Sequence, residues 1–160
     1  IASSTGVDVY ACVASALMAQ AGPMQAGGMI DLGQYLTDLL ATTDEPRVYT
    51  GIPCFGHPLY DRDPRAELLL NMVRDLPGDI ITKERLLQFV DRVHGSTGVY
   101  PNLFGALVIL LRILDLPASA AVYLHCMGRA AGWVAHAAEQ RLSGLMLRPR
   151  ARYMGVQPIH

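Results

Sequence analysis

The feature of this chain that most limits its fold is a nearly unbroken series of apolar patterns at helical spacing. Between residues 30 and 40, apolar side chains recur at intervals close to those of one helix face. Proline and glycine, which end helices, separate most of the successive patterns. The sequence therefore predicts helices within residues 7–22, 27–44, 63–78, 82–98, 100–117 and 117–144. Residues 45–63 lack this period and predict a loop or a short pair of strands. Because helical patterns cover nearly all of the remaining chain, we expect an all-α fold.

Residue types at the ends of these patterns predict where individual helices begin and end. Asp63 precedes Pro64, which is a typical pairing of an N-cap with the first helical position. Thr82 is the expected N-cap of the next helix, and Gly95 is its expected C-cap. We expect the last long pattern to form two helices that divide near Gly128.

Composition excludes some classes of function. The formal net charge is -1, so electrostatics give no reason to expect a nucleic acid or an anionic membrane surface as partner. The longest apolar stretch, residues 104–111, is far too short to span a bilayer. Cys12, Cys54 and Cys126 are odd in number and have no framework spacing, which predicts reduced thiols in a cytoplasmic protein.

A low content of charge indicates that this chain meets further protein. Charged residues make up only 17% of it, whereas about 25% is usual for a soluble domain. Some apolar helix surface should therefore contact another chain or a missing part of this one. The chain begins at Ile1 without an initiator methionine, so we expect it to be a fragment or a processed piece.

The segment Pro53–Glu67, PCFGHPLYDRDPRAE, places an imidazole close to a guanidinium. Arg65 should lie in the first turn of a helix, where free N–H groups and the helix dipole favour an anion. His57 can exchange a proton near neutral pH, and Gly56 would allow a ligand to approach the backbone. An ordinary N-cap with an exposed arginine and a packed loop histidine explains the same residues. Cys54 and His57 could form half a zinc site, but no second pair matches, so we expect no metal.

Other arginines and histidines are weaker candidates. Arg129 and Arg148 could help to bind a dicarboxylate, although a solvated surface is an equally simple explanation. His125 and His136 lie in apolar helical runs, where a hydrogen-bonded core histidine is more common than a ligand.

Several motifs together resemble the citrate synthase family, in register over essentially the whole chain. They are STGVDVYACVASALMAQAGPMQAGG, FGHPLYDRDPRA, YPNLFGALVILLRILDLP, GRAAGWVAHAAEQ and RPRARYMG. The resemblance implies an all-α homodimer in which this chain is the C-terminal portion of a longer one. It implies that residues 1–22 end a large domain, residues 23–126 form a small domain, and residues 127–160 return to the large domain.

The resemblance also implies an activity and its residues. Enzymes of the family condense an acyl-CoA with oxaloacetate, with the coenzyme A thioester as a substrate and no bound cofactor. His57 matches the histidine that protonates the keto oxygen of oxaloacetate. Arg65 and Arg129 match ligands of its carboxylates, and Arg148 matches the ligand supplied across the dimer. Arg62 lies where the family often has a basic residue near coenzyme A.

Two positions depart from the family pattern. The family's Gly-Pro-Leu-His-Gly-Gly reads Gly-Pro-Met-Gln-Ala-Gly here, which puts Gln25 at the enol-stabilising histidine. The family's Pro-Asn-Val-Asp reads Pro-Asn-Leu-Phe, which puts Phe104 at the catalytic base. Phe104 cannot take a proton, and loss of a positioned base typically lowers the rate by ~10²–10⁴-fold. Asp61 is one conceivable replacement.

Three hypotheses follow for the function. The first is a citrate synthase-like enzyme of altered condensation chemistry, or one that cleaves a citryl-CoA-like thioester with His57 as the base at the hydroxyl. The second is a non-catalytic homologue that binds a dicarboxylate or regulates an active paralogue. The third is a helical interaction domain that has only inherited the scaffold.

Overall fold

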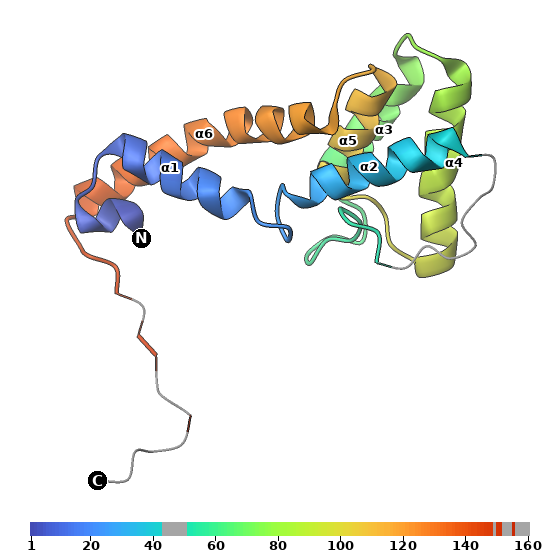
Figure 1. Cartoon of the computed structure of the whole chain (residues 1–160). Helices are drawn as coiled ribbons and strands as arrows, with labels where there is room; N and C mark the ends of the chain where they lie inside the picture. The colour runs from blue at the N-terminus through green and yellow to red at the C-terminus, as the bar shows by residue number, and fades with distance from the viewer. Residues whose placement is uncertain (43–50, 149, 152–154, 156–160) are drawn as a thin grey trace. The chain divides into compact units, whose positions relative to one another are not determined.

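The computed structural model of the chain describes residues 1–42, 51–148, 150, 151 and 155, and in this part all regular structure is helical (Figure 1). The predicted all-α fold is confirmed. Phe55 and Pro101 form an isolated bridge within the described residues. The helices are the 3₁₀ turn η1 (Ala2–Thr5), α1 (Val9–Gln20), α2 (Gly28–Ala41), α3 (Pro64–Asp75), α4 (Ile80–Thr97), α5 (Leu103–Ile113) and α6 (Ala118–Ser143). Among the described helices, none combines the length and hydropathy that crossing a bilayer requires.

The chain divides into two compact units. One consists of Ile1–Ala16 with Ala130–His160, and the other of Leu17–Arg129. The domain boundaries that the family resemblance implies, at residues 22 and 126, stay a prediction.

The unit Leu17–Arg129 is built around α5. The sequence of α5 is almost entirely apolar, and this helix packs mainly against α3 and α2. Leu32 and Leu36 of α2, Phe89 of α4 and Ile109 of α5 are almost completely buried in one core. Burial of each such side chain stabilises the fold by about 1.5–3 kcal/mol. This core gives the loop before α3 and the start of α5 a rigid base.

The unit Ile1–Ala16 with Ala130–His160 is held by hydrogen bonds between its first and last segments. The buried Ser3 hydroxyl donates to the carbonyl of Ala137 at 2.7 Å. The Arg141 guanidinium donates to the carbonyl of Val7 at 2.8 Å. These bonds pair the N-terminal turn with the second half of α6.

The starts of α3 and α4 test two of the predicted caps. Asp63 caps α3 and Pro64 is its first residue, as predicted. The prediction that Thr82 is the N-cap of α4 was wrong, because the helix begins earlier and Asp79 is its N-cap. The Asp79 carboxylate accepts from the backbone N–H of Thr82 at 2.8 Å and from its hydroxyl at 2.7 Å. Aspartate satisfies the free N–H groups of the first turn, so it starts the helix three residues sooner.

Two predicted glycine interruptions are also wrong. Gly95 lies inside α4, and Gly98 is its C-cap in a left-handed conformation with φ 76°. Gly128 does not divide the last helix, because α6 runs continuously from Ala118 to Ser143. Glycine in a helix interior costs only about 1 kcal/mol relative to alanine, and the alanine-rich neighbours of Gly128 offset this.

Candidate functional site

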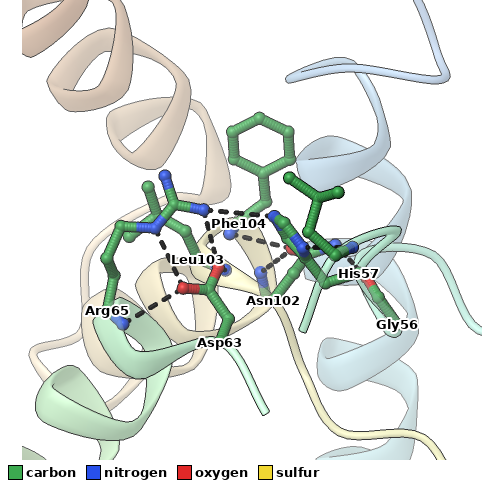
Figure 2. Close-up of polar contacts among 9 residues, drawn as sticks. Gly56, His57, Asp63, Arg65, Asn102, Leu103 and Phe104 are labelled. Carbon is green, nitrogen blue, oxygen red and sulfur yellow. Dashed lines mark hydrogen bonds and ion pairs between the residues drawn. The ribbon is translucent and has the colours of Figure 1, made fainter. Parts of the chain in front are cut away.

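The Asp63 carboxylate joins the first turn of α3 to the first residue of α5. It is 2% exposed. One oxygen, Oδ1, accepts from the backbone N–H of Arg65 at 3.1 Å and from its Nε at 2.9 Å. The other, Oδ2, accepts from Arg65 Nη2 at 2.9 Å and from the backbone N–H of Leu103 at 3.0 Å (Figure 2). Both oxygens are therefore used, and the capping role predicted from sequence is only part of the work of this residue.

The same contacts set the charge of the pair. Hydrogen bonds from the Arg65 side chain lower the pKa of Asp63 to about 2, and the backbone N–H groups of Arg65 and Leu103 act in the same direction. The Asp63 carboxylate raises the pKa of Arg65 in turn. Both groups are charged at neutral pH. The Arg65 side chain is 55% exposed, so the part of its guanidinium that does not face Asp63 can meet a ligand.

His57 lies beside Arg65 with its ring nitrogens in distinct roles. Nδ1 accepts from the backbone N–H of Leu59 at 3.1 Å, which leaves the proton of a neutral ring on Nε2. Nε2 is 3.4 Å from Arg65 Nη2. Both groups are then donors, so this is a close approach of two N–H groups, and a single oxoacid could accept from both. Gly56, with φ 81°, precedes the ring in a conformation that favours glycine.

Asn102 fixes the His57 loop to the start of α5, a role that the sequence analysis missed. Its side-chain Nδ2 donates to the carbonyl of Gly56 at 3.0 Å, and its backbone N–H donates to the carbonyl of Cys54 at 3.0 Å. Its Oδ1 accepts from the N–H of Phe104 at 3.0 Å and so caps α5. Asparagine before an apolar helix is a recognised N-cap signal. The signal for the cap was present, whereas the contacts to the loop were not predictable.

A third group of residues meets at Phe104. Its ring contacts the ring of His125 on α6 edge-on, with centroids 4.7 Å apart and an interplanar angle of 85°. The amide Nε2 of Gln20, at the end of α1, is 3.1 Å from Nε2 of His125. Burial lowers the pKa of His125, and the charges of Arg129 and Arg65 lower it further. His125 is thus a half-buried, neutral imidazole with one hydrogen-bond partner among the described residues.

Comparison with known proteins identifies the family. Residues 1–150 match the family described as "Citrate synthase, C-terminal domain". The chain belongs to the citrate synthase family. This confirms the resemblance inferred from the motifs.

Individual relatives agree with this assignment. The chain is 31% identical to citrate synthase of Synechocystis sp. over 97% of its own length and 43% of that protein. It is similar in structure to citrate synthase of Thermotoga maritima (TM-score 0.76, 24% identity, 99% of this chain and 47% of the other). It is also similar to citryl-CoA lyase of Hydrogenobacter thermophilus (TM-score 0.80, 19% identity, 99% and 68%). At these identities, the structural matches support the fold alone, and the chain spans less than half of the Synechocystis relative.

The other residues that match family positions lie in varied surroundings. Arg62 stacks 3.9 Å from the centre of the Tyr100 ring and donates to the Tyr100 hydroxyl. Gln25 is exposed in the turn between α1 and α2. Arg129 is exposed on α6, and Arg148 is exposed in the unit Ile1–Ala16 with Ala130–His160. Their proposed roles stay predictions.

His136 and Asp61 are two further residues for which the sequence raised an expectation. His136 was expected in the core, but its side chain is 71% exposed and pairs with Glu139 at 3.2 Å, so that prediction is wrong. It faces solvent because only one side of this part of α6 is covered. Asp61, the conceivable replacement base, is exposed, and in the described part of the chain no hydrogen bond or ion pair joins it to His57.

Metal-binding side chains do not cluster in the described part of the chain, where no group of three or more could hold an ion. Cys54 is a free thiol, as are Cys12 and Cys126. Burial raises the pKa of Cys54 to about 12, and the negative charge of Asp31 contributes to this. Cys54 is therefore a protonated thiol at neutral pH, which suits neither metal binding nor nucleophilic chemistry.

Proposed function

We propose that this chain carries the oxoacid half of a site that joins an acyl-CoA to oxaloacetate or cleaves a citryl-CoA-type thioester. The observation that supports this most directly is the arrangement of Asp63, Arg65 and His57. A buried carboxylate holds a half-exposed guanidinium in place, and Nε2 of the His57 ring lies 3.4 Å from Nη2 of that guanidinium. A carboxylate and an adjacent keto oxygen are the groups that such a pair of donors would bind.

In the condensation direction, Arg65 binds a carboxylate of oxaloacetate. Arg129 of the same copy and Arg148 of a second copy bind the same oxaloacetate molecule. His57 donates its Nε2 proton to the keto oxygen as the new carbon–carbon bond pushes electrons onto that oxygen. Gln25 can donate a neutral hydrogen bond to the thioester oxygen. In the cleavage direction the same transfer runs in reverse, and the hydroxyl proton returns to Nε2 of His57. The coenzyme A thioester is a substrate in both directions, and the proposal includes no bound cofactor.

The assembly is part of the same proposal. The role of Arg148 requires a homodimer in which each copy supplies this arginine to the site of the other. A cytoplasmic location agrees with the three free cysteines, because thiols stay reduced there.

Dicarboxylate binding without catalysis is the second candidate. The observation that favours it is Phe104, whose ring has no group that can take a proton. In that case the arginines would still bind oxaloacetate or citrate, and no bond would form or break.

The test is release of coenzyme A thiol from several acyl-CoAs by the intact protein, with and without oxaloacetate, together with cleavage of citryl-CoA. We expect oxaloacetate-dependent turnover and a loss of at least ~10²-fold in His57→Ala. His136→Ala is the matched control, because His136 is an exposed histidine on a helix. Absence of turnover in both directions, combined with stabilisation by oxaloacetate in a melting experiment, would support dicarboxylate binding instead.

A further inference from the structure

The reaction proposed above needs a group that removes a proton from the carbon next to the thioester carbonyl. Phe104 occupies the position that the family pattern assigns to this group. Its ring meets a titratable side chain, the imidazole of His125, at a centroid distance of 4.7 Å. A proton acceptor close to Phe104 is therefore present on a different helix, α6.

The nearby carboxylate is a poor alternative. Asp63 accepts four hydrogen bonds, from three groups of Arg65 and from the N–H of Leu103. Its low pKa, about 2, makes it a weak base. Taking a proton would break the contacts that hold Arg65.

We propose that His125 is the catalytic base of the condensation and that it replaces the carboxylate missing at Phe104. This inference rests on the proposed function of the site. Nothing in the sequence pattern marked His125 for this role. The arrangement is a base held by a second residue, because Gln20 on α1 lies within hydrogen-bond distance of Nε2 of His125.

Gln20 can orient the imidazole for proton transfer. A half-turn of the amide presents its oxygen to Nε2, so Gln20 can accept from an Nε2–H as well as donate to a bare nitrogen. When Gln20 accepts, the lone pair of the neutral ring is on Nδ1. Among the described residues, no hydrogen-bond partner occupies Nδ1. The reactive form is therefore the tautomer with Nε2–H bound to Gln20 and Nδ1 free.

Nδ1 of His125 takes the proton from the carbon next to the thioester carbonyl, and the C–H electron pair forms the enolate. The enolate carbon then bonds to the keto carbon of oxaloacetate, whose oxygen takes the Nε2 proton of His57. Water cleaves the thioester and releases the coenzyme A thiol and a carboxylate. The proton on His125 passes to solvent, and His57 is reprotonated from water.

The surroundings keep His125 unprotonated at neutral pH. The charged groups that act on it are Arg129, four residues on in α6, and Arg65 of α3. Gln20 of α1 and Phe104 of α5 complete its contacts, and both are uncharged. Burial and the two positive charges lower its pKa, so the base is available at pH 7. The rate should fall only when acid protonates it.

The experiment compares wild type, His125→Asn, and His125→Asn combined with Phe104→Asp in the intact protein. Thiol release from acetyl-CoA with oxaloacetate is followed from pH 5 to 8, and oxaloacetate binding is measured by calorimetry. We expect His125→Asn to lower kcat at least ~10²-fold with oxaloacetate affinity changed less than about 3-fold. The added Phe104→Asp should raise kcat again by at least ~10-fold. The pH dependence of this double variant should no longer show the acidic limb of the wild-type profile. His136→Asn is the control for loss of an exposed imidazole.

Three results would overturn the proposal in different ways. Wild-type protein without turnover in either direction would refute the proposed function and this inference together. Active wild type with an equally active His125→Asn would refute the inference alone. Loss of oxaloacetate binding along with activity in His125→Asn, without recovery by Phe104→Asp, would assign His125 to the structure of the site and not to proton transfer.

Discussion

Replacement of Asp63 by asparagine should test how one buried carboxylate holds the site together. Asparagine has one oxygen where Asp63 uses two, so an NH₂ group would face either the backbone N–H and Nε of Arg65, or Arg65 Nη2 together with the Leu103 N–H. A buried N–H without an acceptor costs about 1–3 kcal/mol. We therefore expect a loss from this source although asparagine is a good N-cap in general.

Loss of the charge adds a second contribution. A pKa lowered from 3.8 to about 2 corresponds to about 2.5 kcal/mol of stability at neutral pH. The Arg65 side chain is 55% exposed, so water screens part of the attraction and about 1–2 kcal/mol is a better expectation. Together the two contributions predict that Asp63→Asn lowers the free energy of unfolding by about 2–5 kcal/mol.

The assay is urea unfolding of the intact protein at several pH values. Because the folded pKa of Asp63 is depressed, its ionic contribution is complete above about pH 4 and disappears as the pH falls from about 4 to 2. The difference between wild type and Asp63→Asn should shrink over that interval. Asp79→Asn is the matched control, since Asp79 is an exposed N-cap of α4. Equal losses in the two variants, or a difference independent of pH, would refute the reasoning.

Two further predictions concern close packing near the site. Gly105→Ala would place a Cβ 2.6 Å from the carbonyl oxygen of Cys54 and should destabilise the protein, whereas the Cβ of Gly95→Ala would meet nothing within 4 Å and should stabilise α4 by up to about 1 kcal/mol. The melting temperatures of the two variants check this, and a Gly105→Ala variant as stable as wild type would contradict it. Burial raises the pKa of Cys54 to about 12, so its alkylation by iodoacetamide should remain slow from pH 7 to 9 until the protein is unfolded. Rapid labelling of Cys54 in the folded protein would show that this thiol is more accessible than its burial indicates.

Local patterns predicted the helices well because their causes are close in sequence. The apolar period of residues 30–40 and the pairing of Asp63 with Pro64 both depend on neighbours within one or two turns. The wrong cap at Thr82 has the same origin. Both Asp79 and Thr82 are good N-caps, and the choice depended on which side chain reaches the free N–H groups.

Contacts between distant residues account for what the sequence did not reveal. His125 and Gln20 are 105 positions apart, and only the packing of helices brings them together. An apolar helical run favoured a core position for His125, and no local signal indicated Gln20. The motif around His57 and Arg65 was visible because its members are eight positions apart, whereas the second partner of Asp63, Leu103, was not.

The bonds between the His57 loop and the start of α5 have a consequence for motion. Gly56 donates to the carbonyl of Tyr100 at 2.7 Å, and Asn102 bonds the carbonyls of Cys54 and Gly56. We therefore expect the loop and the start of α5 to move together. Any opening of the site would carry His57 and Phe104 together, so their mutual alignment would persist while their distances to more remote groups change.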